Sequence, residues 1–380
     1  MIRFSAPLLL ILSLAACGDG QPFTFDESST DGSTTGGSTG GGDTGGSTGG
    51  GDTGGSTTDA AGGNNPDGNT GATDSLNTGT VRPPQSTDLI ARGDIIRAEA
   101  AGDSSVNGRV SAVQYIPLPR DALIVDGLGF DGENTYSRGD PISQLGSAFQ
   151  VYEADVASPD FLTGNAIDQV RPFRAIYGVS ENSLDTGEPR TSLAIVRTGD
   201  FTGFGFGGYL YERNGSVVLP ETGQAIFTGS YAGVRVFSGR DGMELTQGDM
   251  EIAIDFRDFN DNNAVRGEVT NRQAFNIDGS PVALGGEGGL VLPRLPFSIT
   301  VGGTDIQPNG EFSGRVANSI LSDTGSRVTY EEGNYYAVIA GDTTDPSDGG
   351  EIVGVLKVES LDPRYQEVTA QETGGFIVYR

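Results

Sequence analysis

Short runs of alternating apolar and polar residues, separated by Gly, Asn-Gly and Asp-Gly, fill the chain from residue 83 to residue 380. The clearest run is 249–257, whose apolar residues share one face of a strand: Met250, Ile252, Ile254 and Phe256. Its other face is mostly charged: Glu251, Ala253, Asp255 and Arg257. A turn cluster at 258–263 and a second alternating run at 265–271 complete a predicted hairpin with one buried face.

The same pattern predicts further strands at 174–177, 192–197, 208–212, 234–237, 297–301, 335–339, 352–358 and 375–379. Helix signals are few. Residues 88–101 predict one short helix closed by Gly102, and Asp140-Pro141 predicts the start of another. The fold class indicated is all-β.

A second pattern, Gly-x-aromatic-small-Gly, occurs at 199–203, 229–233 and 310–314, with a weaker copy at 333–337. We interpret it as a strand entry, in which a glycine permits a bend and the aromatic ring covers the gap. A small antiparallel barrel needs such corners, although a chain with 61 Gly also produces some matches by chance. We therefore expect a C-terminal antiparallel β-barrel of about eight strands at 225–380, preceded by a smaller β-rich domain at 83–224.

The order 229–233, 252–256 and 265–269 resembles the barrel of transferrin-binding-protein-B-like surface lipoproteins. Residues 312–314, then 335–336 through 350–354, look like the closing pattern of that family, although the insert 342–348 interrupts it. The resemblance covers about 225–380. It implies that 83–224 takes the place of the family's handle-type β domain, but no motif matches there. Family members capture host proteins at the bacterial surface, and none of their ligand contacts can be transferred to this sequence by position.

The first 16 residues have a short basic start, an apolar core and small residues before the cut, as in a secretory signal peptide. Leu14-Ala-Ala-Cys17 resembles a bacterial lipobox, which implies a lipid-modified Cys17. Several acyl chains anchor durably, because each buried methylene adds about 0.8 kcal/mol. An ordinary signal peptide that happens to contain Cys is the alternative. Gly18 follows Cys17, so the usual inner-membrane retention Asp is not adjacent and a lipid-anchored position at the outer membrane is favoured.

Residues 17–82 are rich in Gly, Ser, Thr and Asp and contain a nine-residue repeat. Such a segment buries almost no apolar area, so nothing offsets the entropy of ordering it. It predicts a disordered acidic tether with an r.m.s. span of roughly 45 Å. The repeat is similar to calcium-binding β-roll repeats, but it lacks the apolar residue that each turn of those repeats needs.

Composition excludes several functions. The chain has no His and one Cys, so Ser-His-Asp catalysis, common zinc sites and disulfides within the chain are ruled out. Lys357 is the only lysine. A net charge of −28 argues against nucleic acid as a partner. We expect no catalytic residue, no metal and no cofactor.

Two loops have residue spacings similar to those of known ligand-binding motifs. Asp258, Asn260 and Asn262 have the first three spacings of a calcium-binding EF-hand loop, but Asn263 and Val269 stand where Gly and Glu are needed. We interpret these residues as a solvated hairpin loop and, with 285–289 and 342–349, as the candidate ligand-binding loops. Residues 127–132 match G-x-G-x-x-G after an apparent strand at 122–126, but no helix signal follows, so a nucleotide site is not indicated.

The densest aromatic stretch consists of Phe201, Phe204, Phe206, Tyr209 and Tyr211. It predicts packing inside a barrel or between sheets, with an exposed patch that anchors a partner as the alternative. The sequence as a whole predicts a non-enzymatic outer-membrane lipoprotein that presents a barrel to a protein or solute ligand. A structural envelope lipoprotein and a carbohydrate-active enzyme with paired carboxylates remain the competing hypotheses.

Overall fold

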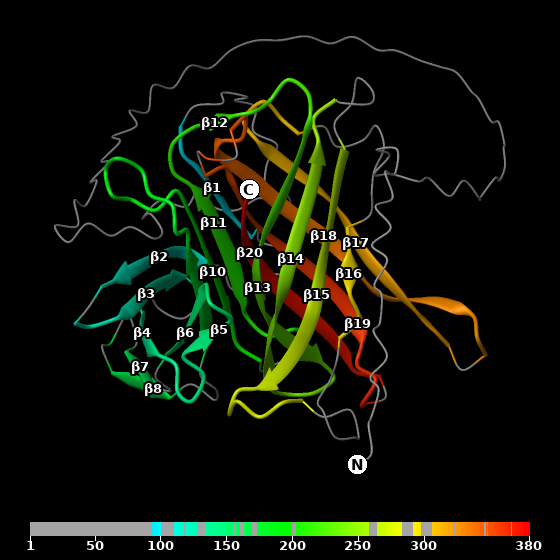
Figure 1. Ribbon diagram of the computed structural model, residues 1–380. Helices are drawn as coiled ribbons and strands as arrows, with labels where there is room; N and C mark the ends of the chain where they lie inside the picture. The colour runs from blue at the N-terminus through cyan, green and yellow to red at the C-terminus, as the bar shows by residue number, and fades with distance from the viewer. Residues whose placement is uncertain are drawn as a thin grey trace, which may run out of the picture. The chain divides into compact units, whose positions relative to one another are not determined.

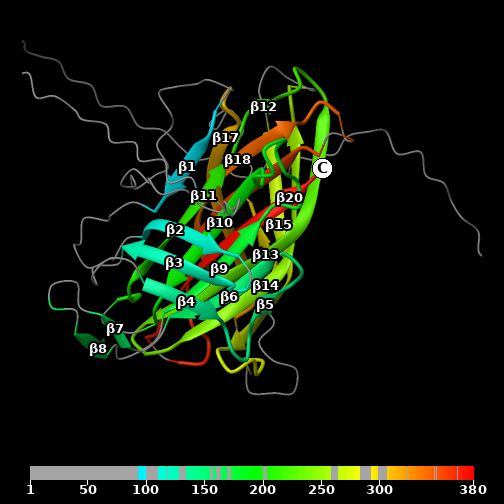
Figure 2. The same cartoon turned by 90° about the vertical axis from the view of Figure 1, so that its left-hand side faces the viewer.

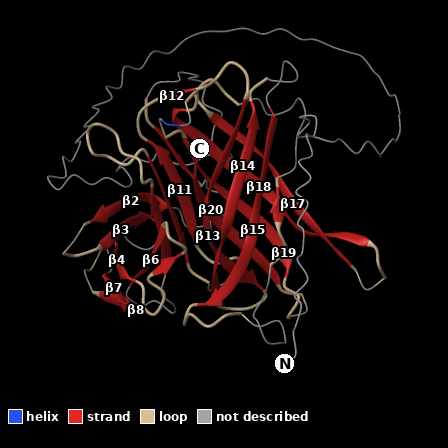
Figure 3. Cartoon of the chain, in the orientation of Figure 1, coloured by secondary structure: helices blue, strands red, loops and turns tan. Residues whose placement is uncertain are grey.

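The computed structural model describes residues 93–99, 110–117, 119–127, 134–154, 157–159, 163, 165–168, 173–199, 203–257, 264–282, 292–297, 306–322, 324–345, 347, 349–365 and 367–380. All of them lie in one compact unit, residues 63–380. Figure 3 shows that strands form nearly all of its regular structure. The expected signal peptide, Cys17 and the tether lie outside the described residues and stay predictions, as do the domain boundaries.

Of the helical turns in the described part of the chain, none has the length and apolar character to span a bilayer.

The first sheet has nine antiparallel strands in the order β1-β11-β10-β9-β6-β4-β3-β2, with β5 paired to β6 (Figures 1 and 2). Their bounds are β1 Ile95–Ala98, β2 Val110–Ile116, β3 Ala122–Gly127, β4 Asn134–Arg138, β5 Gln144–Leu145, β6 Phe149–Ala154, β9 Arg174–Val179, β10 Thr191–Arg197 and β11 Gly207–Arg213. A separate pair consists of β7 Ala157–Pro159 and β8 Ala166–Asp168.

The second sheet closes into a barrel of eight strands, which confirms the expected architecture (Figure 1). Their bounds are β13 Gln224–Ser238, β14 Met243–Asp255, β15 Ala264–Asn276, β16 Leu295–Pro296, β17 Glu311–Leu321, β18 Arg327–Asp342, β19 Glu351–Leu361 and β20 Thr369–Tyr379. Strand β20 pairs with β13, and the seam is closed by β16 on β15 and by a bridge between Phe297 and Val316 of β17. The short β12 (Val217–Val218) pairs in parallel with the end of β18.

The barrel lumen is filled with side chains. One part holds an apolar core that includes Phe227, Ile252, Leu356 and Phe376, each inaccessible to solvent. Toward the end of the barrel where β13 meets β14, charged residues replace it. We call them the ion cluster; its arginines are Arg235, Arg240, Arg272 and Arg364, and its acids are Glu244, Glu331, Asp362 and Glu372. The four bases and four acids of this cluster balance one another.

Arg272 is the centre of this cluster. It binds both carboxylate oxygens of Glu331 at 2.7 and 2.9 Å and one oxygen of Glu372 at 2.9 Å, and it is 1% exposed. Burial opposes the ionisation of Glu372, but Arg272 and Arg235 outweigh it and hold its pKa below the usual range. Among the described residues, the lumen therefore holds an apolar core and, at one end, a charge-balanced polar cluster.

A second apolar core joins the first sheet to the outside of the barrel. The first sheet contributes Phe149, Ile176, Leu193 and Ile195 among others, and the barrel contributes Val234, Val353, Val355 and Ile377 among others. A third core, with Leu123, Tyr152 and Ala194, lies on the opposite face of the first sheet. Strand β10 is consequently buried along its whole length.

Several sequence predictions hold. Residues 249–255 of the run 249–257 lie in β14 and the last two follow it; all four apolar residues are buried, and β15 completes the hairpin. Asp255, predicted on the charged face, is instead 2% exposed, at a barrel end where β14 is paired on both sides. The expected strands at 174–177, 192–197, 208–212, 234–237, 335–339, 352–358 and 375–379 all lie within observed strands.

Both helix predictions are wrong where the structure describes the chain. Within 88–101, residues Ile95–Ala98 form β1, because all four pair with β11 and Ile95 and Ala98 are buried. Pairing with a sheet edge overrides local helix preference. Asp140-Pro141 lies in a bend between β4 and β5, two strands that run in the same direction and both pair with β6.

One Gly-aromatic-Gly motif is a strand entry as predicted: at 310–314, Gly310 has φ 86° and β17 begins at Glu311. The motif at 199–203 lies partly outside the described residues. Residues 229–233 and 333–337 lie in the middle of β13 and β18 instead. The motif glycines Gly229 and Gly333 instead allow close approach of a neighbouring backbone, at Ile377 and Lys357. Glycines outside the motifs make room for rings: a side chain at Gly374 would overlap the Tyr231 ring, and one at Gly354 would come within 2.5 Å of Phe376. The device is an aromatic ring laid over a glycine across the sheet.

Candidate functional site

The predicted ligand-binding loops fall only partly within the described residues. The connection between β14 and β15 lies outside them, with its four candidate residues Asp258, Asn260, Asn262 and Asn263. Residues 285–289, between β15 and β16, also lie outside them. The loop after β18 is described in part: Asp342 accepts hydrogen bonds from Thr344 and Asp345 accepts them from Ser347. These carboxylates stabilise the turn itself.

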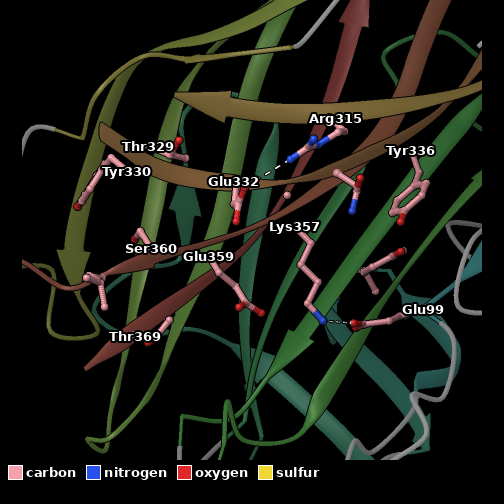
Figure 4. A pocket seen from close by; sticks show the side chains of 14 residues that line it. Glu99, Arg315, Thr329, Tyr330, Glu332, Tyr336, Lys357, Glu359, Ser360 and Thr369 are labelled. Atoms are coloured by element: carbon pink, nitrogen blue, oxygen red, sulfur yellow. Dashed lines mark hydrogen bonds and ion pairs between the residues drawn. The ribbon is translucent and has the colours of Figure 1, made fainter. Parts of the chain in front are cut away.

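The described residues carry a groove of about 700 Å³ on the outer wall of the barrel (Figure 4). Strands β18 and β19 form its floor, and Glu99, directly after β1, and Tyr209 of β11 form one side. We call it the groove; its residues are Glu99, Tyr209, Arg315, Thr329, Tyr330, Glu332, Gly333, Asn334, Tyr336, Lys357, Glu359, Ser360, Leu361 and Thr369. It is thus built where the outward face of the barrel meets the edge of the first sheet.

The single lysine anchors this meeting point. Lys357 Nζ lies 2.7 Å from Glu99 Oε1 (Figure 4). Arg197 Nη2 lies 2.7 Å from Glu99 Oε2. Burial opposes the ionisation of Glu99, but Arg197 and Lys357 outweigh it and hold its pKa below the usual range. Lys357 is therefore bound in an ion pair and is not presented as a free amine nucleophile.

Two carboxylates of the groove bear on the enzyme hypothesis. Glu332 and Glu359 are opposite each other in the β18–β19 register. Glu332 is 63% exposed and pairs with Arg315, and Glu359 accepts a hydrogen bond from Gln371. A glycosidase acid needs a buried, proton-retaining environment, and the solvated Glu332 does not have one. In the described part of the chain, His, Cys, Asp and Glu form no group that could hold a metal.

A hairpin projects from the barrel beside the groove, drawn in orange in Figure 1. We call residues 319–329 the arm. The register between β17 and β18 shifts between Asn318 and Ser319, which leaves Tyr330 as an extra residue at the base of the arm. Such a bulge bends and twists a strand. Glu331 pairs with Ser360, but β19 ends one residue later at Leu361, so the arm extends beyond its neighbour.

The arm exposes both its backbone and its apolar side chains. Within the described residues no strand pairs with 327–330 on the side of β19, or with 319–321 on the side away from β18. Ile320, Leu321 and Val328 are 40%, 73% and 42% exposed, and nearby Leu361 is 68% exposed. Exposed strand edges with apolar side chains are the surfaces that other chains pair with.

The described residues of the densest aromatic stretch pack in or against the apolar cores, as predicted. Tyr209 and Tyr211 are buried in the core between the first sheet and the barrel, and Phe204 packs against that core. Phe206 packs on the opposite face, and Phe201 lies outside the described residues. Tyr209 has a further role that the sequence did not indicate, since it also lines the groove.

The sequence did not identify the groove. Its central ion pair joins Glu99 to Lys357, 258 residues apart, and only the closed barrel brings them together. The one available signal was the uniqueness of Lys357 in an acidic chain. The arm was partly predictable, since 335–339 was expected as a strand, but nothing local shows that β18 continues past its neighbour.

Comparison with models of protein families gives no match, and comparison with curated protein sequences gives none either. Among solved structures, the chain is similar to two crystal structures of the vaccine antigen transferrin binding protein B from Haemophilus parasuis Hp5, a double mutant and a single mutant. The first is 8% identical with a TM-score of 0.32, covering 75% of this chain and 60% of the other. The second is 9% identical with a TM-score of 0.29, covering 75% and 61%.

The chain therefore spans about 60% of the length of these solved proteins. The likeness is weak and concerns the fold alone. Both solved proteins carry the name of the family that the sequence motifs resemble.

Proposed function

We propose that this protein is a lipid-anchored, non-catalytic binding module that captures an extended segment of a partner protein with the arm and the groove. The observation that carries the proposal is the unpaired edge of the arm at 327–330, which continues past the end of β19 and borders the groove. A partner strand placed there would extend the sheet and hydrogen-bond to the free backbone groups.

The filled lumen supports an external site. Barrels that hold a solute do so in an interior cavity, whereas here the apolar core and the ion cluster occupy the interior. The site must then use the outer wall or the loops, and the groove is a concave surface with buried tyrosine, exposed Leu361 and charges of both signs. A strand-adding partner would place alternate side chains over Leu361 and Val328.

The net charge of the chain indicates which charge its partner should carry. At −28 the protein repels acidic partners at long range and attracts basic or neutral ones. We therefore expect the captured segment to combine apolar residues with Lys or Arg.

Site-specific photo-crosslinking tests this site. A benzoylphenylalanine placed at Val328 or Leu361 of the full chain in its native cells should cross-link to one protein partner, and hydrogen exchange of 327–330 should slow in the complex. The control position is Ile226, which is 58% exposed on β13.

Equal cross-linking from Ile226, or no cross-linked protein from either groove position, would contradict the proposal. Cross-linking to a second copy of this chain alone would instead assign the arm to self-association.

The lipid anchor is tested separately. Mass spectrometry of the mature protein should find acyl groups on Cys17, and Cys17→Ser should release the protein from the membrane fraction. A mature protein that begins elsewhere, or that carries no acyl group, would refute the anchor without bearing on the groove.

A further inference from the structure

A second cavity, of about 350 Å³, lies entirely within the first sheet and its loops and shares no residue with the groove. We call it the tyrosine pocket. Its lining comes from β2, β4, β6 and β9, from the turn before β3 and from the loop between β9 and β10. The size is in the range of small-molecule sites.

Aromatic rings form one wall of the pocket. Tyr115 and Tyr177 are stacked, with ring centroids 5.7 Å apart and planes 22° apart, and Tyr152 adds a third ring. Tyr152 and Tyr177 are buried, so their positions are fixed by the sheet, while Tyr115 is only partly covered. A rigid aromatic wall offers an apolar surface to the C–H groups of a ligand.

Asp121 and Arg138 form the polar centre. Asp121 Oδ1 accepts hydrogen bonds from Tyr152 at 2.8 Å and Tyr115 at 3.4 Å, and Asp121 Oδ2 lies 3.6 Å from Arg138. Arg138 Nη1 donates to the Tyr152 hydroxyl at 3.0 Å. Asp121 adopts φ 44°, a strained conformation for a residue with a side chain.

This centre keeps hydrogen-bonding capacity for a ligand. The Asp121 and Arg138 side chains are 27% and 33% exposed, so both reach solvent through the pocket mouth. A guanidinium has five N–H donors and a carboxylate about four acceptor sites, more than these contacts use. Gln150 and Ser183 add neutral polar groups around the lining.

We propose that the tyrosine pocket binds a neutral, polyhydroxylated ligand: one or two sugar units of a glycan. The C–H face of a pyranose would lie on the tyrosine rings, and adjacent hydroxyls would bond to Asp121 and Arg138. A neutral ligand fits because the two charges are already paired, whereas a charged or zwitterionic ligand would have to separate them. This site is independent of the arm and extends the function to glycan recognition.

Saturation-transfer NMR on the full chain tests the proposal. The probes are the methyl glycosides of glucose, galactose, mannose, fucose and N-acetylglucosamine, with L-alanine as a zwitterionic comparison. At least one glycoside should receive saturation, and its affinity should fall roughly tenfold in Arg138→Gln and in Tyr115→Leu, since each variant removes a ligand contact.

The matched controls are Arg294→Gln and Tyr365→Leu, at exposed residues outside both cavities, which should leave the affinity unchanged. Circular dichroism confirms that each variant is folded. The proposal is overturned if no glycoside receives saturation, if both pocket variants bind as well as the native chain, or if L-alanine binds and the glycosides do not.

Discussion

Individual charged residues inside the barrel are important for its stability, because they are buried and paired with one another. Removing one partner of a buried, hydrogen-bonded ion pair leaves the other charge without compensation, which costs more than the pair contributes. Arg272 is the extreme case, because it serves two glutamates and is almost inaccessible to solvent. The ion cluster therefore makes the stability of the barrel sensitive to single substitutions.

We expect Arg272→Met to lower the free energy of unfolding by about 3–5 kcal/mol, because Glu331 is then buried without a counter-charge. Adding Glu331→Gln should recover part of the loss. Arg315→Met, at a side chain 69% exposed, should change the stability by less than about 1 kcal/mol. Urea titration followed by circular dichroism measures all three, and equal losses for Arg272 and Arg315 would refute the explanation.

Glu351 behaves differently from these paired acids. Burial raises its pKa above the usual range, although Thr191 of β10 and Ser180 and Asn182 of the loop between β9 and β10 donate hydrogen bonds to it. The folded state then holds this proton more tightly than the unfolded chain, so the contribution of Glu351 to stability is largest below its ordinary pKa of 4.5 and falls as the pH rises.

Relative to Glu351→Gln, the native chain should therefore lose stability as the pH rises above 4.5. Denaturant titrations at a series of pH values give this difference, with Glu332→Gln as a control for the change in net charge. A difference that grows in favour of the native chain as the pH rises would show that the hydrogen bonds, and not burial, dominate at Glu351.

Among the elements, pairs of one glycine and one aromatic ring recur across neighbouring strands. Phe149 of β6 lies opposite Gly178 of β9, and a Cβ at Gly178 would come within 2.5 Å of the Phe149 ring. The clash would involve only a side chain, since the next nearest atom, in Ile377, is 3.6 Å away. This pair therefore permits a clean test of the device.

Gly178→Ala should destabilise the protein by about 1–3 kcal/mol through overpacking. Phe149→Leu should also destabilise it, by about 1–2 kcal/mol, but it opens space for the new methyl group. The double variant should then cost about 1 kcal/mol less than the sum of the two. Strict additivity in thermal or urea unfolding would exclude the contact.

The elements also show what the sequence could predict. Alternation is a local property, so the hairpin of β14 and β15 and most long strands of the barrel were predicted correctly. The helix expected at 88–101 failed because its outcome depends on pairing with β11, more than 100 residues away. The two-residue β16 that completes the barrel, and the contact between Glu99 and Lys357, depend on closure and leave no local pattern.

At the scale of the whole described unit, one apolar core belongs to both sheets. Leu193 of β10 illustrates this, because its side chain reaches the backbone of β20 at Gly375, where a Cβ would come within 2.7 Å of it. The first sheet and the barrel should therefore unfold together.

Leu193→Ala should lower the stability by about 2–5 kcal/mol. It should reduce hydrogen-exchange protection in β6 and β9 and in β19 and β20 by the same free energy. Loss of protection confined to the first sheet would mean that the barrel is stable on its own and that the two sheets are separate cooperative units.

The protruding arm could pair with the arm of another copy of the same protein. An unsatisfied strand edge does not distinguish a ligand from another molecule of its own kind, and a lipid-tethered population would crowd such edges together. The ion cluster is charge-balanced, so it does not account for the net charge of −28. Negative charge elsewhere on the chain makes the copies repel one another. The negative surface charge therefore opposes association between copies. High salt, which shortens the screening length to a few ångströms, would remove this repulsion and favour association.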